Sequence, residues 1–303
     1  MARTYSLLDV FSDKPLSGNP LAVVHDAQGL SDKQMQAIAA EFNLSETVFV
    51  LPPEDLHHTA ALRIFTPYEE LEFAGHPTVG TAAILASRQL QGQDTALASM
   101  ITLEEKIGII RCGVRRLENG SLHAEFDLPK LPKPAHQIGS KQDIAAALGI
   151  DPLLITFENH VPTSFNAGLN FVYVPLRNAQ ALQSLAPHMA LWDRAFGHVS
   201  HNNAFIYTRE TLHADAAFQA RMLYKGDQIR EDAATGSAVA AFAGVIARFD
   251  RPLNGTHSFS IEQGLQMGRP SRIDLEMQMQ DGKIENARIG GCAAIIASGE
   301  LYI

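Results

Sequence analysis

Two segments of the sequence, one in each half of the chain, combine a glycine-bearing turn with an apolar helix of small residues. They read FAGHPTVGTAAILA at residues 73–86 and DAATGSAVAAFAGVIA at residues 232–247. Glycine lets a backbone approach a ligand closely, and the first N–H groups of a helix have no partner inside the helix. Two such helix N-termini predict a site that attracts a carboxylate. The alternative is that both segments are only tightly packed helix starts.

A proline-rich segment near the middle of the chain separates these halves. Residues 128–139 read LPKLPKPAHQIG, and their three prolines remove backbone donors and favour an extended path. A chain of 303 residues is also too long for one ordinary core. We therefore expect two domains, at residues 1–128 and 135–289.

Helix signals open each half in a similar way. Ser31 and Gln34 form a capping-box pattern, and apolar residues follow from Met35 at i, i+3, i+4 and i+7. In the second half Ser140 precedes an apolar stretch that Gly149 is placed to end.

Strand signals surround these helices and outnumber them. The predicted strands are Tyr5 to Phe11, Thr47 to Leu51, Thr59 to Phe65, Ile109 to Val114, Phe171 to Val174, Ala204 to Tyr207 and Ala294 to Ser298. This mixture predicts an α+β fold in which each half is a strongly curved sheet packed on a helix.

Composition excludes several classes of partner. The net charge of −9 provides no basic footprint, so we expect no nucleic-acid partner and no anionic membrane surface. The first residues show no signal peptide, and the longest apolar run, near Ala238 to Ala247, is typical of a buried helix. The two cysteines, Cys112 and Cys292, lie in strand-like contexts and are expected in the core. So few cysteines fit a reducing compartment, and we expect a cytoplasmic protein.

Three side chains are candidates for acid–base chemistry. Glu46 lies between a helix end and an apolar strand, where desolvation would raise its pKa, although it could equally be a solvated residue at a strand start. His76 follows Gly75 at a helix N-terminus, where the dipole should keep the imidazole neutral; the alternative is a core or capping histidine. Pro77 suits the first helical position. Asp232 is either a capping residue or a second carboxylate of the site.

No metal site is predicted. His57, His58, His198 and His201 have no convincing ligand spacing. Arg269, in the glycine-punctuated turn at residues 262–271, could bind an anion or another chain, but a surface turn is the simpler interpretation.

Five segments together resemble the phenazine-biosynthesis isomerase (PhzF-like) family. They are DVFSDKPLSGNPLAVV (9–24), SETVFV (45–50), EFAGHPTVGTA (72–82), REDAATGSAVAA (230–241) and EQGLQMGRPS (262–271). The resemblance implies the diaminopimelate-epimerase-like fold: two pseudo-symmetric domains, each a curved, mostly antiparallel sheet or barrel around a central helix, with the active site between them. It also implies a homodimer, and a last strand, at about 290–303, that returns to the first domain.

The same resemblance implies roles for individual residues. Glu46 corresponds to the family's general acid/base and Asp232 to its aspartate. The GH pair of the family corresponds to Gly75 and His76, and its substrate-anchoring GS pair to Gly236 and Ser237. The family commonly has proline after the aspartate, where this chain has Ala233.

These residues predict an isomerase that uses no cofactor. Glu46 would move a proton, and with it a double bond, in a small anionic carboxylic acid, with His76 and Asp232 assisting. A two-thiol racemase is disfavoured because neither glycine turn contains cysteine. The alternatives are a one-base epimerase or racemase, and a non-catalytic binding protein. The sequence does not identify the physiological substrate.

Overall fold

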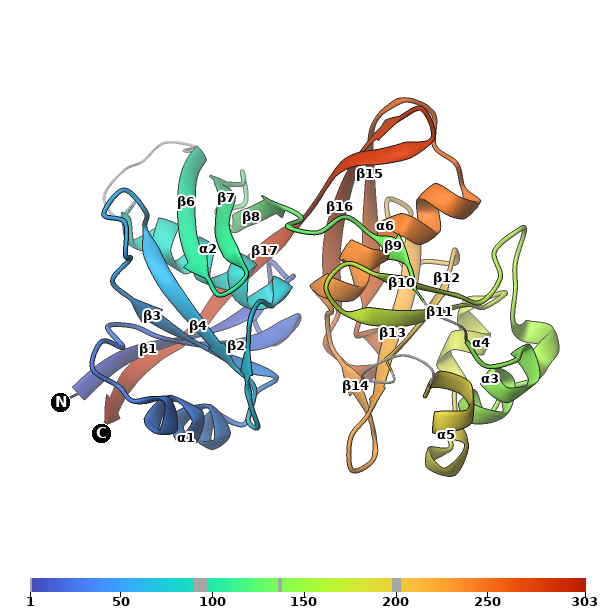
Figure 1. The fold of residues 1–303 in the computed structure, drawn as a ribbon, viewed down its shortest axis with the longest axis horizontal. Helices are drawn as coiled ribbons and strands as arrows, with labels where there is room; N and C mark the ends of the chain where they lie inside the picture. Colours follow the sequence, from blue (N-terminus) through green and yellow to red (C-terminus); the bar gives the residue numbers. More distant parts are fainter. Residues whose placement is uncertain (1, 90–97, 136–137, 198–202) are drawn as a thin grey trace. The chain divides into compact units, whose positions relative to one another are not determined.

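The computed structural model describes residues 2–89, 98–135, 138–197 and 203–303 (Figure 1). The chain divides into two compact units, residues 1–129 with 290–303 and residues 130–289. The second boundary falls inside the last strand, β17 (Lys283–Tyr302), which therefore contributes to both units.

The first unit contains a closed barrel of eight strands. Its strands pair in the order β1–β2–β3–β4–β6–β7–β8–β17, and β17 pairs again with β1 to close the ring. The barrel strands that precede β17 are β1 (Ala2–Val10), β2 (Asn19–Val24), β3 (Glu46–Leu51), β4 (Ala60–Phe65), β6 (Ala98–Glu105), β7 (Gly108–Arg116) and β8 (Leu122–Asp127). The two-residue strand β5 (Glu70–Leu71) pairs with β4. Closure leaves no unpaired sheet edge in this barrel.

The helix α2 (Gly75–Gln89) packs against the wall of this barrel on many sides. It contacts β1, β2, β3, β6, β7 and β8, and every residue from Gly75 to Ile84 is buried. Small residues make this fit possible: a Cβ added at Gly80 would lie 2.6 Å from Leu21 and 2.7 Å from Val10. A helix buried all round needs an apolar surface on every side, as this sequence provides. The second helix of the unit, α1 (Asp32–Phe42), contacts β3 and β4 through Met35, Ile38 and neighbouring core residues.

The second unit is built on a mixed sheet around another apolar helix. Its pairings run β9–β10–β11–β12–β13–β15–β16, with β14 also paired to β13; β11–β12 and β13–β15 are parallel. The strands are β9 (Lys133–Pro134), β10 (Thr163–Asn166), β11 (Asn170–Pro175), β12 (Ala204–Thr208), β13 (Phe218–Lys225), β14 (Ile229–Asp232), β15 (Gly255–Gln263) and β16 (Ser271–Gln280).

Helix α6 (Gly236–Phe249) lies against this sheet and contacts β9, β10, β11 and β16. The Phe242 ring packs among the rings of Tyr173, Tyr207 and Phe218. A separate apolar cluster holds three short helices, α3 (Lys141–Leu148), α4 (Ala179–Gln183) and α5 (Met189–Phe196). Two 3₁₀ turns, η1 (Pro152–Leu154) and η3 (Leu265–Met267), complete the described elements.

Most of the sequence-based expectations for secondary structure are confirmed. Ser31 forms the full capping box with Gln34, Ser140 caps α3, and Gly149 ends α3 in the left-handed conformation. Strands occur at every predicted range. The strand-heavy mixture of α and β elements is also confirmed, whereas the pseudo-symmetry of the two domains stays a prediction.

One local expectation was wrong, and a second was incomplete. Helix α2 begins at Gly75, so Pro77 is its third residue; this position is still tolerated because the first N–H group with a partner in the helix is that of Thr78, which bonds the Ala74 carbonyl at 3.2 Å. The proline-rich segment is not only a linker, because it includes β9, which pairs with β10.

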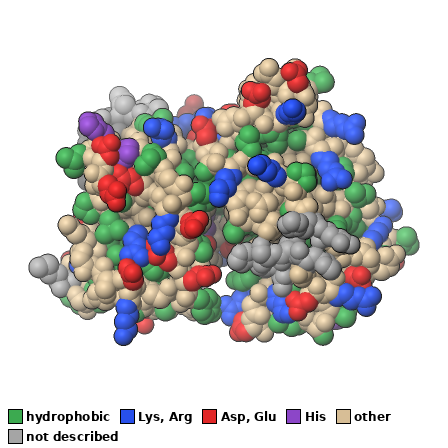
Figure 2. All heavy atoms as spheres, viewed as in Figure 1, with side chains coloured by type: hydrophobic (Ala, Val, Ile, Leu, Met, Phe, Trp, Pro, Cys, Tyr) green, Lys and Arg blue, Asp and Glu red, His purple; other side chains and the backbone are tan. Residues whose placement is uncertain are grey.

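Charged side chains of both signs lie on the face of the molecule in view (Figure 2). Figure 2 shows Lys and Arg side chains interspersed with Asp and Glu over the face in view. Among the described residues, no helix combines the length and hydropathy needed to cross a bilayer.

Candidate active site

Glu46 and His76 meet in the first unit. Helix α1 ends at Phe42, the left-handed Asn43 reverses the chain, and Glu46 then begins β3. His76 is the second residue of α2. The His76 Nε2 atom lies 3.4 Å from Glu46 Oε2, and neither atom is in contact with solvent. This distance is slightly long for a hydrogen bond, as in many catalytic pairs before substrate binds.

The His76 imidazole is neutral at neutral pH. Burial alone lowers its pKa to about 3, because the charged ring would lose its hydration. Burial thus favours the same neutral state that was expected from the helix dipole. A neutral imidazole can both donate and accept a proton, so a carboxylate beside it forms a unit able to take up and pass on a proton.

Asp232 begins the corresponding turn of the second unit, as the last residue of β14. Its Oδ2 atom accepts a 2.6 Å hydrogen bond from the Thr235 hydroxyl. Thr235 in turn is the residue that precedes α6. Asp232 is thus attached to the N-terminus of α6 without serving as the cap of that helix.

The N-terminus of α6 has no side-chain cap, because the Thr235 hydroxyl is used on Asp232. The N–H groups of Ala238 and Val239 bond the Thr235 carbonyl, each at 3.1 Å. Gly236 and Ser237 therefore begin a 14-residue helix whose first N–H groups are the ones that commonly bind anions.

The turn of the second unit depends on a residue that the sequence analysis missed. Gln263 is fully buried at the end of β15; its Nε2 donates to the Asp232 carbonyl at 2.9 Å and its Oε1 accepts from the Thr235 N–H at 3.1 Å. Next to it, a Cβ added at Gly264 would lie 2.6 Å from the Ala233 carbonyl oxygen. The EQG motif was interpreted as a surface turn, but it supports the residues around Asp232. Its glycine, which implies close backbone approach, was the available signal.

The structure therefore brings the six predicted residues together in two groups. Glu46, Gly75 and His76 form one group in the first unit. Asp232, Gly236 and Ser237 form the other in the second unit. Their catalytic and binding roles stay predictions.

One cluster has the composition of a metal site, but an arginine occupies it. Glu158, His160 and Asp250 lie within ligand distance of one another in the described part of the chain. Arg209 donates to both Asp250 and Glu158, and His160 Nε2 lies 2.7 Å from Asp250 Oδ1. A guanidinium already supplies the positive charge that a cation would bring, so this is an ion-pair network.

His57 and His58 each pair with a carboxylate. His57 Nδ1 lies 2.8 Å from Asp55, and His58 Nδ1 lies 2.7 Å from Glu104. His198 and His201 lie outside the described residues. Arg269 lies partly buried in the turn between η3 and β16, where its N–H bonds the Gly264 carbonyl at 3.0 Å.

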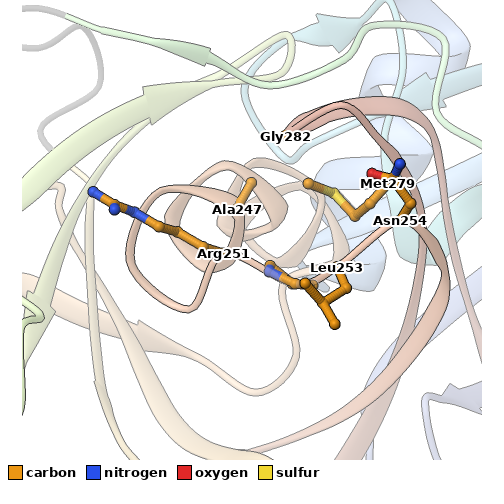
Figure 3. A pocket seen from close by; sticks show the side chains of 7 residues that line it. Ala247, Arg251, Leu253, Asn254, Met279 and Gly282 are labelled. Atoms are coloured by element: carbon orange, nitrogen blue, oxygen red, sulfur yellow. The ribbon is translucent and has the colours of Figure 1, made fainter.

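A surface cavity of about 680 Å³ lies at the far end of α6 (Figure 3). It is lined by Ala247, Leu253, Asn254, Met279 and others, and the Arg251 side chain extends away from Met279. Ala247 is eleven residues after Gly236, about 16 Å along a helix. This cavity is therefore distinct from the Asp232 turn and contains none of the candidate catalytic groups.

The sequence pattern of the family described as phenazine biosynthesis-like protein, PhzC-PhzF, matches residues 8–299. The chain belongs to this family. An uncharacterized isomerase of Mesorhizobium japonicum is 49% identical over 99% of both chains. The trans-2,3-dihydro-3-hydroxyanthranilate isomerase of Pseudomonas aeruginosa is 32% identical, again over 99% of both. The chain is thus an enzyme of the isomerase type.

Solved structures agree with membership of the PhzF family. A PhzF-family phenazine biosynthesis protein of Bacillus anthracis superposes with a TM-score of 0.89 at 25% identity, over the full length of both chains. A hydroxyproline epimerase of Agrobacterium vitis, 12% identical, superposes with a TM-score of 0.65 over 99% of this chain and 92% of its own. The second likeness concerns the fold alone, and it supports the expected similarity to epimerases.

Two expectations for this PhzF-family chain concern its cysteines and the turn that follows Asp232. Cys112 is fully buried in β7, where burial and the nearby Glu105 raise the pKa of its thiol, and Cys292 lies in β17. Ala233, which replaces the common proline, is buried, and its carbonyl accepts a 3.1 Å hydrogen bond from Ser271. The turn is therefore fixed by tertiary contacts where a proline would have stiffened it locally.

Proposed function

We propose that the chain is a cofactor-independent isomerase that moves a proton and a double bond within a small carboxylic acid. The observation that carries this proposal is the 3.4 Å approach of Glu46 Oε2, at the start of β3, to Nε2 of the neutral His76 in α2, with both atoms shielded from solvent. A carboxylate paired with a neutral imidazole is a suitable set for general acid–base catalysis.

The reaction requires one proton and no outside electrons. Glu46, as the carboxylate, takes a proton from a carbon next to the conjugated system, and the C–H electron pair enters that system. The protonated Glu46 then returns the proton to another carbon, so that one C–H bond breaks, one forms, and the double bond shifts. The substrate's own conjugation stabilises the intermediate carbanion, so the step needs no cofactor.

The substrate carboxylate would bind the backbone N–H groups at Gly236 and Ser237, with Gly75 as a further contact. The uncapped start of α6 supports this assignment, because anions bind such N–H groups readily. Asp232 would orient the substrate, since Thr235 and the Gln263 network fix its position.

The substrate of the Pseudomonas aeruginosa relative provides the first compound to test. We expect deuterium from D₂O to enter trans-2,3-dihydro-3-hydroxyanthranilate or its isomerised product when the protein is present. Glu46→Gln should lower the rate by about 10²–10⁴-fold, because the amide cannot accept the proton. Glu41→Gln, on the exposed side of α1, is the matched control and should change nothing.

The outcomes separate this proposal from its alternatives. Exchange that survives Glu46→Gln would contradict the role of Glu46. Exchange with inversion at a stereocentre and no double-bond shift would indicate a one-base epimerase. Absence of exchange with a panel of small unsaturated acids, together with binding of one of them, would indicate a binding protein. The homodimer and the cytoplasmic location stay predictions as well.

A further inference from the structure

A second glutamate lies in the interior of the first unit, next to the start of α2. Glu105 is the last residue of β6, and only 7% of its surface is exposed. Its Oε1 atom lies 2.8 Å from the Thr78 hydroxyl oxygen. Its Oε2 atom is buried and has no hydrogen-bond partner among the described residues.

The Thr78 hydroxyl has two close oxygen neighbours but only one proton to donate. It lies 2.8 Å from Glu105 Oε1 and also 2.8 Å from the Ala74 carbonyl oxygen. A carbonyl can only accept, so two full hydrogen bonds, instead of one proton shared between two acceptors, require the Glu105 carboxyl to donate its own proton to Thr78. The geometry thus gives a directed chain from Glu105 through Thr78 to Ala74.

The neutral form of Glu105 also fits its surroundings. An ionised carboxylate would keep a buried oxygen, Oε2, with no donor to stabilise it, which is costly. Burial raises the pKa of Glu105 to about 8; a hydrogen bond donated by the Thr78 hydroxyl to an ionised carboxylate would act in the opposite direction. The carboxyl is therefore protonated at neutral pH and begins to ionise in mildly alkaline solution.

The titratable groups on neighbouring elements do not offset such an ionisation. Cys112, on β7, is near enough to interact with Glu105, and its thiol stays protonated because its pKa is raised by burial. His76, on α2, is neutral. Lys106 is half exposed and pairs with Glu70 at 2.6 Å. Glu104, which precedes Glu105 on β6, accepts hydrogen bonds from the Glu54 and Asp55 N–H groups.

We propose that Glu105 is a positioning residue whose neutral carboxyl fixes the Ala74–Thr78 turn and thereby keeps His76 against Glu46. Ala74 directly precedes Gly75 and His76, and Thr78 follows them by two residues, so the chain of bonds spans the catalytic turn. Ionisation would remove the proton that makes both bonds possible and would place an uncompensated charge beside the turn. The catalytic consequence rests on the proposed function, but the protonation and the position of His76 do not.

The first experiment measures protonation without any substrate. In the infrared difference spectrum between wild type and Glu105→Gln at pH 6.5, we expect a carboxylic acid C=O band that disappears as the pH rises through about 8. A carboxylate band at pH 6.5 would overturn the proposal. In parallel, the NMR signals of the His76 ring should shift over the same pH range in wild type and stay constant in Glu105→Gln. A His76 signal with the same alkaline shift in both proteins would also overturn it.

The second experiment measures turnover. The side-chain amide introduced by Glu105→Gln cannot ionise but can still donate to Thr78. In wild type the exchange rate should fall as the pH rises through about 8, where Glu105 ionises. Glu105→Gln should keep the exchange rate at pH 7 within about threefold and should not show this alkaline decline. Glu105→Leu and Thr78→Val break the chain and should lower the rate by about 10–100-fold at every pH, since small misplacements of catalytic groups are costly.

Glu104→Gln is the matched control, because it changes the neighbouring carboxyl and should keep the alkaline decline. Loss of that decline in Glu104→Gln, or its persistence in Glu105→Gln, would contradict the assignment. If no acid undergoes exchange at all, the proposed function fails, while the infrared and NMR results still decide the role of Glu105.

Discussion

Glu104 and Glu105 are adjacent on β6, yet their carboxyl groups differ in protonation because neighbouring side chains of a strand point to opposite faces. In β6 the side chains of Ile101, Leu103 and Glu105 alternate inward and are buried. Glu104 points to the other face, where hydrogen bonds from the Asp55 and Glu54 N–H groups lower its pKa, while burial raises the pKa of Glu105. At neutral pH the Glu104 carboxyl is ionised and the Glu105 carboxyl is not.

His76 should make the protein sensitive to acid. The unfolded imidazole takes up a proton near pH 6.5, whereas burial holds the folded pKa at about 3. Between these values the unfolded chain binds one more proton, so the free energy of unfolding falls as the pH falls, by about 1.4 kcal/mol per pH unit. His76→Asn should show a correspondingly weaker loss of stability between pH 7 and pH 4.5.

Urea denaturation at several pH values tests this prediction. The slopes against pH are compared, because the substitution can also change stability at every pH. His57→Asn is the control, since it makes the same substitution at an exposed side chain. His25 keeps a slope of its own in all the proteins, because burial lowers its pKa to about 4. Equal slopes for wild type and His76→Asn would show that the imidazole is protonated in the folded protein.

At the scale of elements, the Gln263 side chain should stabilise the turn at Asp232 more than the conformational preferences of the turn's own residues do. Gln263→Met removes bonds to the Asp232 carbonyl and to both the N–H and hydroxyl of Thr235, and leaves a buried N–H without a partner. We expect a loss of about 1–3 kcal/mol and slower exchange. Gln278→Met, at an exposed position on β16, should change stability by less than about 0.5 kcal/mol. Denaturation midpoints for both variants provide the measurement, and equal effects would contradict this account.

The elements that could be predicted from sequence are those that local chemistry specifies. The bond between Ser31 and Gln34, and the left-handed conformation of Gly149, depend on residues close in the chain. Glu46 and His76 were candidates from their local sequence, the resemblance implied their roles, and the structure adds their 3.4 Å approach. The support from Gln263 was missed because it acts on a turn about thirty residues earlier, and the link from Glu105 to Thr78 spans a similar distance. The alternation of Ile101, Leu103 and Glu105 was a readable signal for the latter.

At the scale of the whole molecule, β17 connects the two units and completes the barrel of the first. The turn at Asp281 and Gly282, with φ of 50° and 74°, has the conformation of a tight hairpin and leads from β16 into β17. From Gly290 onward the strand belongs to the first unit, where it pairs with β1 and β8. The first unit is therefore closed only by the end of the chain, a non-local pairing that strand propensity cannot specify.

The pairing of β17 with β8, which helps to close the barrel, should be most sensitive to an added methyl group at Gly290. A Cβ at this position would lie 2.7 Å from the Glu125 Cβ and 2.8 Å from the Ala124 carbonyl oxygen on β8. Gly290→Ala must therefore separate β8 from β17, and we expect it to cost about 1–3 kcal/mol. Gly113→Ala is the matched control on β7, because its added Cβ would meet nothing closer than 3.8 Å. That variant should be neutral or slightly more stable, since alanine loses less backbone entropy on folding. Thermal unfolding and amide exchange of β1 and β8 would measure both variants; equal stability of the two would mean that β17 does not close the barrel as tightly as its contacts with β8 imply.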